Sequence, residues 1–164
     1  MSDEIRIRIL SPRDGAQLER VADGVFDGPV SDRWSAEFLA DTRHHLAVAV
    51  SNDQIVGMAS AVHYVHPDKG PELWINEVGV APPYQCQGIA KRLLGCLFEL
   101  GSTLGCTEAW VLTEENNGAA RRLYASAGGE EPDKPVYVTF RLNDKQPCKP
   151  PLRIRDSATG VVAR

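Results

Sequence analysis

The segment Glu72–Ala90 reads ELWINEVGVAPPYQCQGIA, and it predicts the centre of the fold. Residues 72–80 fit a strand that stops at Pro82-Pro83, because proline has no N–H to donate to a sheet ladder. Residues 87–104 fit an amphipathic helix, since apolar side chains recur there at steps of three or four. The segment is therefore expected to run from a strand through a short turn into a long helix.

The turn into that helix, residues 85–90, has the form Q-x-x-G-x-A. A helix N-terminus carries free backbone N–H groups and about half a positive charge, so it can bind an anion. The small residues Gly88 and Ala90 leave room for a phosphate to approach the backbone. The turn is neither a Rossmann G-x-G-x-x-G nor a P-loop, which removes support for hydride transfer and for nucleotide hydrolysis. The alternative is a strand-to-helix turn whose small residues serve packing only.

Further strands and helices are expected on both sides of this segment. The patterns predict strands over residues 5–9, 45–50, 55–64, 107–113 and 135–142, and helices over residues 13–27, 31–42 and 117–127. Hairpin-joined strands followed by alternating helices and strands indicate a mixed sheet with helices on its faces, an α/β or α+β fold. Residues 1–142 are expected to form one domain, and residues 143–164, a proline-containing basic tail, to lie outside its core.

Composition narrows the classes of partner and compartment. The 164 residues carry a net charge of −4, which gives no general attraction to nucleic acid or to an anionic membrane. No apolar run approaches the roughly 20 residues of a membrane span, and the acidic start lacks signal-peptide character. The four cysteines form no C-x-x-C pair, and His63-x-x-His66 lacks further ligands for a metal. We therefore expect a reduced, cytoplasmic protein that holds no metal.

A second motif follows the long helix and one further strand. It reads Asn117-x-x-Ala120-x-x-Leu123-Tyr124-x-x-x-Gly128. With the first motif and its preceding strand, it resembles the core of the GNAT superfamily of acyl-CoA-dependent N-acetyltransferases. The resemblance implies the GNAT fold, a mixed, mostly antiparallel sheet of six to seven strands flanked by about four helices. It also implies direct transfer of the acetyl group of acetyl-CoA to a primary amine of a small molecule, and a homodimer.

The resemblance assigns coenzyme A contacts to the matching positions. Backbone groups of Val78 and Val80 are expected to bind the acetyl carbonyl and the pantetheine arm. The loop that begins at Gln85 is expected to wrap the pyrophosphate, and Asn117 to contact the pantetheine. The full set of expected coenzyme-binding residues is Val78, Gly79, Val80, Gln85, Cys86, Gln87, Gly88, Ile89, Ala90, Lys91, Asn117 and Tyr124.

Two residues are expected to carry the proton transfers. Glu77 has apolar neighbours, and burial among them would raise its pKa toward that of a general base. Its strand neighbours Asn76 and Val78 are expected to point to the opposite face. The resemblance implies that Tyr124 is the general acid, and a phenol with an ordinary pKa near 10 holds its proton at neutral pH. The alternatives are an ion-paired or solvent-facing Glu77 and a Tyr124 that only packs in the core.

The strand and first turn especially resemble those of aminoglycoside 3-N-acetyltransferases. In that branch an aspartate occupies the Glu77 position, at the same spacing to Q-G-I-A. This chain departs from the branch there and at Tyr84 and Cys86, where basic residues are usual. Residues 31–45 occupy the part that shapes the acceptor pocket in the superfamily. Two other functions stay open: a catalytically silent acyl-CoA sensor, and a peptide or protein N-acetyltransferase.

Overall fold

The computed structural model describes residues 4–131 and residue 138. The expected strand at 135–142, apart from Val138, and the expected tail at 143–164 lie outside the described residues. The chain divides into a unit of residues 1–130 and a second unit of residues 131–164. All the helices and strands that the structure describes belong to the first unit.

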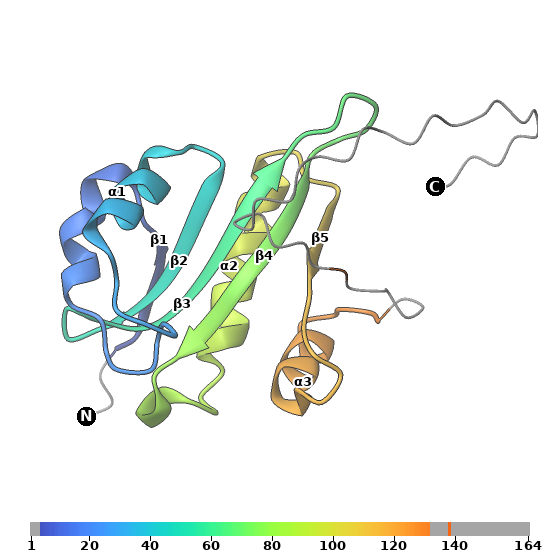
Figure 1. Cartoon of the computed structure of the whole chain (residues 1–164). Coiled ribbons are helices and arrows are strands. Elements are labelled where there is room, and N and C mark those ends of the chain that lie inside the picture. The colour runs from blue at the N-terminus through green and yellow to red at the C-terminus, as the bar shows by residue number, and fades with distance from the viewer. Residues whose placement is uncertain (1–3, 132–137, 139–164) are drawn as a thin grey trace, which may run out of the picture. The chain divides into compact units, whose positions relative to one another are not determined.

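A five-stranded sheet forms the centre of the first unit (Figure 1). Its strands lie in chain order: β1 (Arg6–Ile9), β2 (His44–Ser51), β3 (Gln54–Tyr64), β4 (Glu72–Val80) and β5 (Glu108–Val111). Strands β1 to β4 are antiparallel to their neighbours, and β5 runs parallel to β4. The expectation of a mixed, mostly antiparallel sheet is confirmed. The described residues form five strands rather than six or seven, and the strand expected at 135–142 is not among them.

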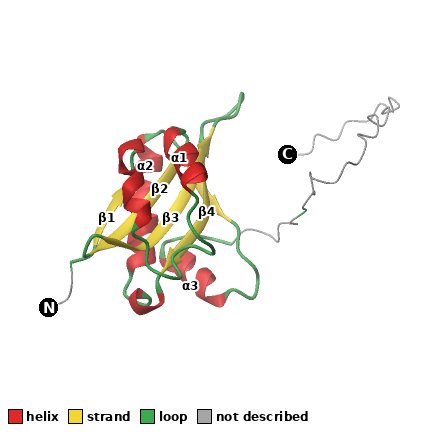
Figure 2. Cartoon of the chain, turned by 60° about the vertical axis from the view of Figure 1, so that its left-hand side comes forward, coloured by secondary structure: helices red, strands yellow, loops and turns green. Residues whose placement is uncertain are grey.

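Helices cover both faces of the sheet (Figures 1 and 2). Helix α2 (Ile89–Thr103) packs on one face against β2, β3 and β4, and α3 (Gly118–Ser126) contacts α2. The 3-10 helix η1 (Pro12–Glu19) and helix α1 (Asp32–Ala40) contact each other and pack over the other face. A 3-10 turn, η2 (Pro82–Tyr84), follows β4 and precedes the turn into α2.

The helix predicted over residues 13–27 is wrong in its length and type. Only Pro12–Glu19 is helical, and it is a 3-10 helix. The residues after it hydrogen-bond to β3 instead: Ile55 N–H donates to Arg20 O and Ala22 N–H donates to Ile55 O, each at 2.8 Å. Because these backbone groups are already paired with the sheet, they cannot also form the hydrogen bonds of a continuing helix.

Alternate residues of the strands feed two separate cores. On the α2 face the strand residues are mostly small, and the four buried leucine and isoleucine side chains of the helix fill the space above them. The helix residues of this core are Ile89, Leu93, Leu94 and Leu97. The other core lies under η1 and α1 and includes Leu18, Leu39, Leu46, Val48 and Met58. Burial of each large apolar side chain contributes about 1.5–3 kcal/mol, so the α2-face core, which includes buried side chains of β4, holds that strand in place.

Two irregularities of β4 position the site. Glu77 pairs with Ser60 and Ile75 pairs with Ala61, so Asn76 is an extra residue, a β-bulge. Strand β5 pairs only with the first half of β4, as far as Ile75. Beyond that point the two strands separate, as Figure 1 shows, and residues 76–80 have no β5 partner in the described part of the chain. The second half of β4 is therefore an open edge.

Candidate active site

The open edge of β4 presents backbone groups of two expected site residues. Ala81 N–H donates to Val56 O of β3 at 2.9 Å. Since hydrogen bonding alternates along an antiparallel strand, the backbone groups of Gly79 also face β3, whereas those of Val78 and Val80 face the open edge. The side-chain amide of Gln85 donates to Val80 O at 3.0 Å, which agrees with this direction. The N–H groups of Val78 and Val80 are thus available for a ligand.

Gly79 has a packing role on the face away from α2. A Cβ atom at this position would lie 2.0 Å from the carbonyl oxygen of Val25. Any larger residue would therefore push the segment around Val25 off the sheet. Glycine here brings that segment, and with it the loop of residues 26–30, close to β4.

The turn before α2 has two residues in the left-handed region. Cys86 has φ of 60° and Gly88 has φ of 75°. The second of these positions explains why α2 begins at Ile89 rather than at Gln87, since a left-handed residue caps a helix but does not belong to it. The side chains of Gln85 and Gln87 donate to backbone carbonyls, Val80 O and Pro83 O, at 3.0 and 3.1 Å. These bonds hold the turn against the end of β4.

The N-terminus of α2 fits a phosphate. The first backbone hydrogen bond into the helix runs from Arg92 N–H to Gly88 O, so the N–H groups of Ile89, Ala90 and Lys91 precede it. Within the described residues no side chain caps this end. A left-handed residue followed by free N–H groups makes a concave, positively polarised surface for an anion. The residues expected to hold the coenzyme A pyrophosphate therefore have the backbone geometry for it.

Glu77 lines a cavity of about 640 Å³ on the face of the sheet away from α2. Burial raises the pKa of this carboxyl, and the negative charge of Asp27 raises it further, while a hydrogen bond from the Asp27 backbone N–H works against both. The cavity takes Trp34 and Phe38 from α1, in the segment expected to shape an acceptor pocket. Glu77 is half-buried and faces this cavity, so the ion-paired alternative has no support in the described contacts.

The position of Asn76 contradicts the expectation that it points to the face opposite Glu77. It lines the same cavity as Glu77, although strict alternation would send neighbours to opposite faces. The bulge at Asn76 is the reason, because it interrupts alternation for one residue. The cavity also holds Ser60, which pairs with Glu77 across the sheet, and Asp27. The sequence patterns gave no indication that these three polar residues share the cavity with Glu77.

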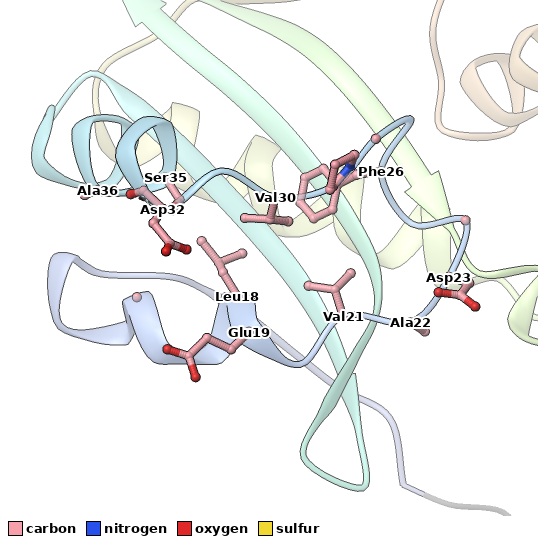
Figure 3. Close-up of a pocket in the computed structure, with 14 residues that line it drawn as sticks. Leu18, Glu19, Val21, Ala22, Asp23, Phe26, Val30, Asp32, Ser35 and Ala36 are labelled. Carbon is pink, nitrogen blue, oxygen red and sulfur yellow. Dashed lines mark hydrogen bonds between the residues drawn. The ribbon is translucent and has the colours of Figure 1, made fainter.

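A second cavity, of about 670 Å³, adjoins the first between η1, residues 21–30 and α1 (Figure 3). The two share the side chains of Leu18, Phe26 and Val30 in their linings. Figure 3 shows Leu18 pointing toward Val30, with the side chain of Asp32 beside them. Glu19 and Asp23 also line it, so its charged lining residues are all carboxylates.

Tyr124 and Asn117 belong to α3. Tyr124 is half-buried and packs against the α2-face core, as do Val78 and Val80, and burial raises the pKa of its hydroxyl. Its phenol is therefore protonated at neutral pH. Asn117 is the N-cap of α3, where its side-chain oxygen accepts from Ala120 N–H at 3.1 Å. Tyr124 thus packs on the α2 face of the sheet, whereas Glu77 lines the cavity on the other face.

Residues 4–131 and residue 138 show neither a metal site nor a membrane span. In that part of the chain no three His, Cys, Asp or Glu side chains come together to hold a metal ion. None of its helices has the length and apolar character needed to cross a bilayer.

The fold and these two motifs define an acetyltransferase. The sequence profile of the acetyltransferase (GNAT) family matches residues 16–128, more than half of the chain, and the protein belongs to this family. It is an enzyme that transfers an acetyl group from acetyl-CoA to an amine.

Two of the relatives are named for acetyl transfer to small amines. Over 103 residues the chain is 26% identical to aminoglycoside N(6')-acetyltransferase type 1 of Salmonella typhimurium. This alignment covers 59% of this chain and 71% of the relative. It is 34% identical over 89 residues to L-2,4-diaminobutyric acid acetyltransferase of Marinococcus halophilus, covering 52% of this chain and 49% of that protein.

Solved structures share the fold. The aminoglycoside N-acetyltransferase AAC(6')-Iy, in complex with the bisubstrate analogue CoA-S-monomethyl-acetylneamine, superposes with a TM-score of 0.71 at 21% identity. The match covers 84% of this chain and 99% of that one. An aminoglycoside acetyltransferase from an uncultured soil metagenomic sample, in complex with sisomicin, gives a TM-score of 0.70 at 20% identity, over 84% and 97% of the two chains. The aminoglycoside relative from Salmonella is named for the 6' position, so the expected 3-N branch is not confirmed.

Proposed function

We propose that this protein acetylates a primary amine of a small cationic molecule, with Glu77 as general base and Tyr124 as general acid. The observation that carries the proposal is the position of Glu77. Its carboxyl has a raised pKa and lines an aromatic and acidic cavity, on the strand whose open edge offers backbone N–H groups. A base, a site for the acceptor and a site for the acyl donor thus converge on the second half of β4.

The donor side is supported by backbone geometry. The N–H groups at the start of α2, with left-handed Gly88 at the cap, suit the pyrophosphate of acetyl-CoA. The N–H groups of Val78 and Val80 along the open edge suit the amide and thioester carbonyls of the pantetheine arm. Hydrogen bonds to the thioester oxygen would polarise the carbonyl and stabilise the negative charge that develops there.

The directions of the two pKa shifts support the proposed proton transfers. The amine nitrogen forms a bond to the thioester carbon, and Glu77 takes the proton that the nitrogen loses, directly or through a water. Tyr124 donates its hydroxyl proton to the sulfur as the carbon–sulfur bond breaks, so the products are an amide and a free thiol. Both groups then exchange their protons with solvent, which restores the enzyme. A raised pKa keeps the phenol of Tyr124 protonated until this step.

A small cationic acceptor is favoured over a peptide by the cavity lining. Trp34 and Phe38 give apolar walls, while Glu77 and Asp27 give negative charge. Carboxylates that line a cleft attract cations and raise their local concentration. The named relatives support the same class, since they act on aminoglycosides and on L-2,4-diaminobutyric acid.

The test is release of free thiol from acetyl-CoA in the presence of single amines, with aminoglycosides, diamino acids, polyamines and amino-terminal peptides as separate arms. We expect thiol release to depend on one of the small amines. We also expect Glu77→Gln and Tyr124→Phe each to reduce the rate of this release. Tight binding of acetyl-CoA without release for any amine would instead favour the silent sensor. Release with peptides alone would contradict the small-molecule acceptor.

A further inference from the structure

One buried hydroxyl in the lining of the Glu77 cavity lacks a hydrogen-bond partner. Ser60 of β3 lines this cavity and is only 8% exposed. Its hydroxyl forms no hydrogen bond with any residue that the structure describes. Buried polar groups are nearly always hydrogen-bonded, because a buried hydroxyl without a partner costs free energy. The Ser60 hydroxyl therefore points to a ligand of the cavity that supplies the missing hydrogen bond.

The other neutral polar residues of this cavity differ from Ser60. The side chain of Ser31 accepts a hydrogen bond from a backbone N–H of α1 at 3.4 Å. The hydroxyl of Ser35 donates to a backbone carbonyl of the same helix at 3.2 Å. Asn76 is exposed, so solvent can satisfy its amide. Among the described residues that line the cavity, Ser60 alone combines a buried position with an unpaired hydroxyl.

Ser60 lies directly opposite Glu77 on the neighbouring strand. The hydrogen bond from Ala81 N–H to Val56 O marks a hydrogen-bonded pair of this antiparallel ladder, and steps of two residues lead from it to the pair of Glu77 with Ser60. The Cα atoms of such a pair are about 5.5 Å apart, and the side chains lie on the same face. No hydrogen bond between the two side chains is among the described contacts. A small polar group that lies between them can therefore bond to both.

The surroundings of this position favour a positively charged hydrogen-bond donor. The carboxylate of Glu77 only accepts hydrogen bonds, and the backbone N–H of Asp27 supplies one of them. Leu46, which pairs with Ser60 on its other side, is apolar and supplies none. A primary ammonium group carries three N–H groups, so it can donate one to Glu77 and one to the Ser60 oxygen. Such charge-assisted hydrogen bonds are stronger than those between neutral groups.

We propose that Ser60 is a specificity-determining residue of the acceptor site, whose hydroxyl accepts a hydrogen bond from the same ammonium group that donates to Glu77. The proposal rests on the proposed function and assigns the recognition of the amine nitrogen to a second residue. After Glu77 has taken one proton, the nitrogen keeps two N–H bonds, so its hydrogen bond to Ser60 is retained. Ser60 thus selects nitrogens that carry hydrogen and holds them beside the base.

Two ligands of equal charge test this hydrogen bond. At neutral pH, n-butylamine and butyltrimethylammonium carry the same alkyl chain and one positive charge each, but only n-butylamine has N–H groups. Each ligand is titrated into the protein saturated with coenzyme A, which has no acetyl group to transfer, and NMR shifts of the backbone amides give Kd. Ser60→Ala should raise Kd for n-butylamine about tenfold, the size of a hydrogen bond to a charged group. It should leave Kd for butyltrimethylammonium within about twofold.

Ser51→Ala is the matched control. Ser51 is also buried, at 2% exposed, and its hydroxyl also lacks a hydrogen-bond partner in the described part of the chain, but it does not line the cavity. Its replacement should leave both Kd values unchanged. Ser60→Thr should keep most of the affinity for n-butylamine, because it retains a hydroxyl. Ser60→Ala should unfold at a temperature no lower than that of the unmodified protein, since it removes an unpaired buried hydroxyl.

Three results would overturn the role of Ser60. They are an unchanged Kd for n-butylamine in Ser60→Ala, an equal increase in Kd for both ligands, and no binding of n-butylamine to the unmodified protein. The titration needs no turnover, so it separates this role from catalysis. Binding that responds to Ser60→Ala as expected, without thiol release from acetyl-CoA for any amine, would reject only the proposed function.

Discussion

The backbone N–H of Asp27 donates to the carboxylate of Glu77, while the Asp27 side chain opposes the negative charge of the same group. One residue of a loop thus both orients the candidate base and raises its pKa. The loop reaches β4 because Gly79 leaves space for the carbonyl of Val25. The position of the base therefore depends on packing between segments about fifty residues apart in the chain.

Replacement of Glu77 by glutamine is expected to reduce kcat/KM by about 10²–10³-fold, the usual contribution of a general base. In the unmodified enzyme, kcat/KM should fall as the pH decreases through the raised pKa of Glu77, since only the carboxylate accepts a proton. The variant should lack this acid limb. A pH–rate profile with one fixed acceptor is the measurement, and a variant with an unchanged profile would exclude Glu77 as the base.

Asp27→Asn should move the acid limb to lower pH without removing it. The substitution takes away the charge that raises the pKa of Glu77 but keeps the backbone N–H that donates to it. With the same acceptor in both enzymes, the titration of the amine itself cancels from the comparison. An acid limb that does not shift would contradict the electrostatic link between the two residues.

Tyr124→Phe is expected to lower kcat by about 10²-fold and to leave KM for acetyl-CoA within about twofold, because the hydroxyl acts only as the thiol leaves. Thermal unfolding of the variant serves as the control, since the ring still packs against the α2-face core. A kcat equal to that of the unmodified enzyme would reduce Tyr124 to a packing residue.

Gly88→Ala tests the phosphate site with a matched control in the same helix. Gly88 and Gly105 flank α2, with φ of 75° and 80°, and neither added Cβ would meet a heavy atom within 4 Å among the described neighbours. Both alanine variants should lose about 1 kcal/mol of stability from the left-handed backbone. Only Gly88→Ala should weaken acetyl-CoA binding, by about tenfold or more, as measured by calorimetry. Equal affinities in the two variants would place the pyrophosphate elsewhere.

A histidine pair is expected to make stability depend on pH. The His45 ring nitrogen Nε2 lies 2.8 Å from Nδ1 of His63, and their rings stack. Burial, followed by the nearby charges of His63 and His44, lowers the pKa of His45 from 6.5 to about 4. Because the unfolded chain then binds more protons than the folded one, stability is complete above pH 6.5 and falls as the pH decreases toward 4, by at most about 1.4 kcal/mol per pH unit.

Urea unfolding between pH 4 and pH 7 measures this loss. His45→Gln should reduce the slope, because glutamine forms a hydrogen bond at this position without taking up a proton. An identical slope in the variant would show that other groups, such as the acidic residues, control the acid dependence.

The sequence alone determined the elements whose patterns are local. The apolar run of 55–64, the prolines after β4 and the leucine spacing of α2 each depend on neighbours within one turn or one strand, and the structure confirms those elements. The two motifs, Q-x-x-G-x-A and N-x-x-A-x-x-L-Y, were sufficient to indicate the family, which the match over residues 16–128 confirms. The assigned roles of Glu77 and Tyr124 stay predictions.

Tertiary structure alone decided the surroundings of the site. The helix predicted over 13–27 stops early because Ile55 takes its backbone hydrogen bonds, and Asn76 joins Glu77 because a bulge breaks alternation. The contact of Asp27 with Glu77 and the register of Ser60 with Glu77 depend on pairings between distant segments. Such pairings depend on how the whole chain packs, and no local pattern of side chains encodes them.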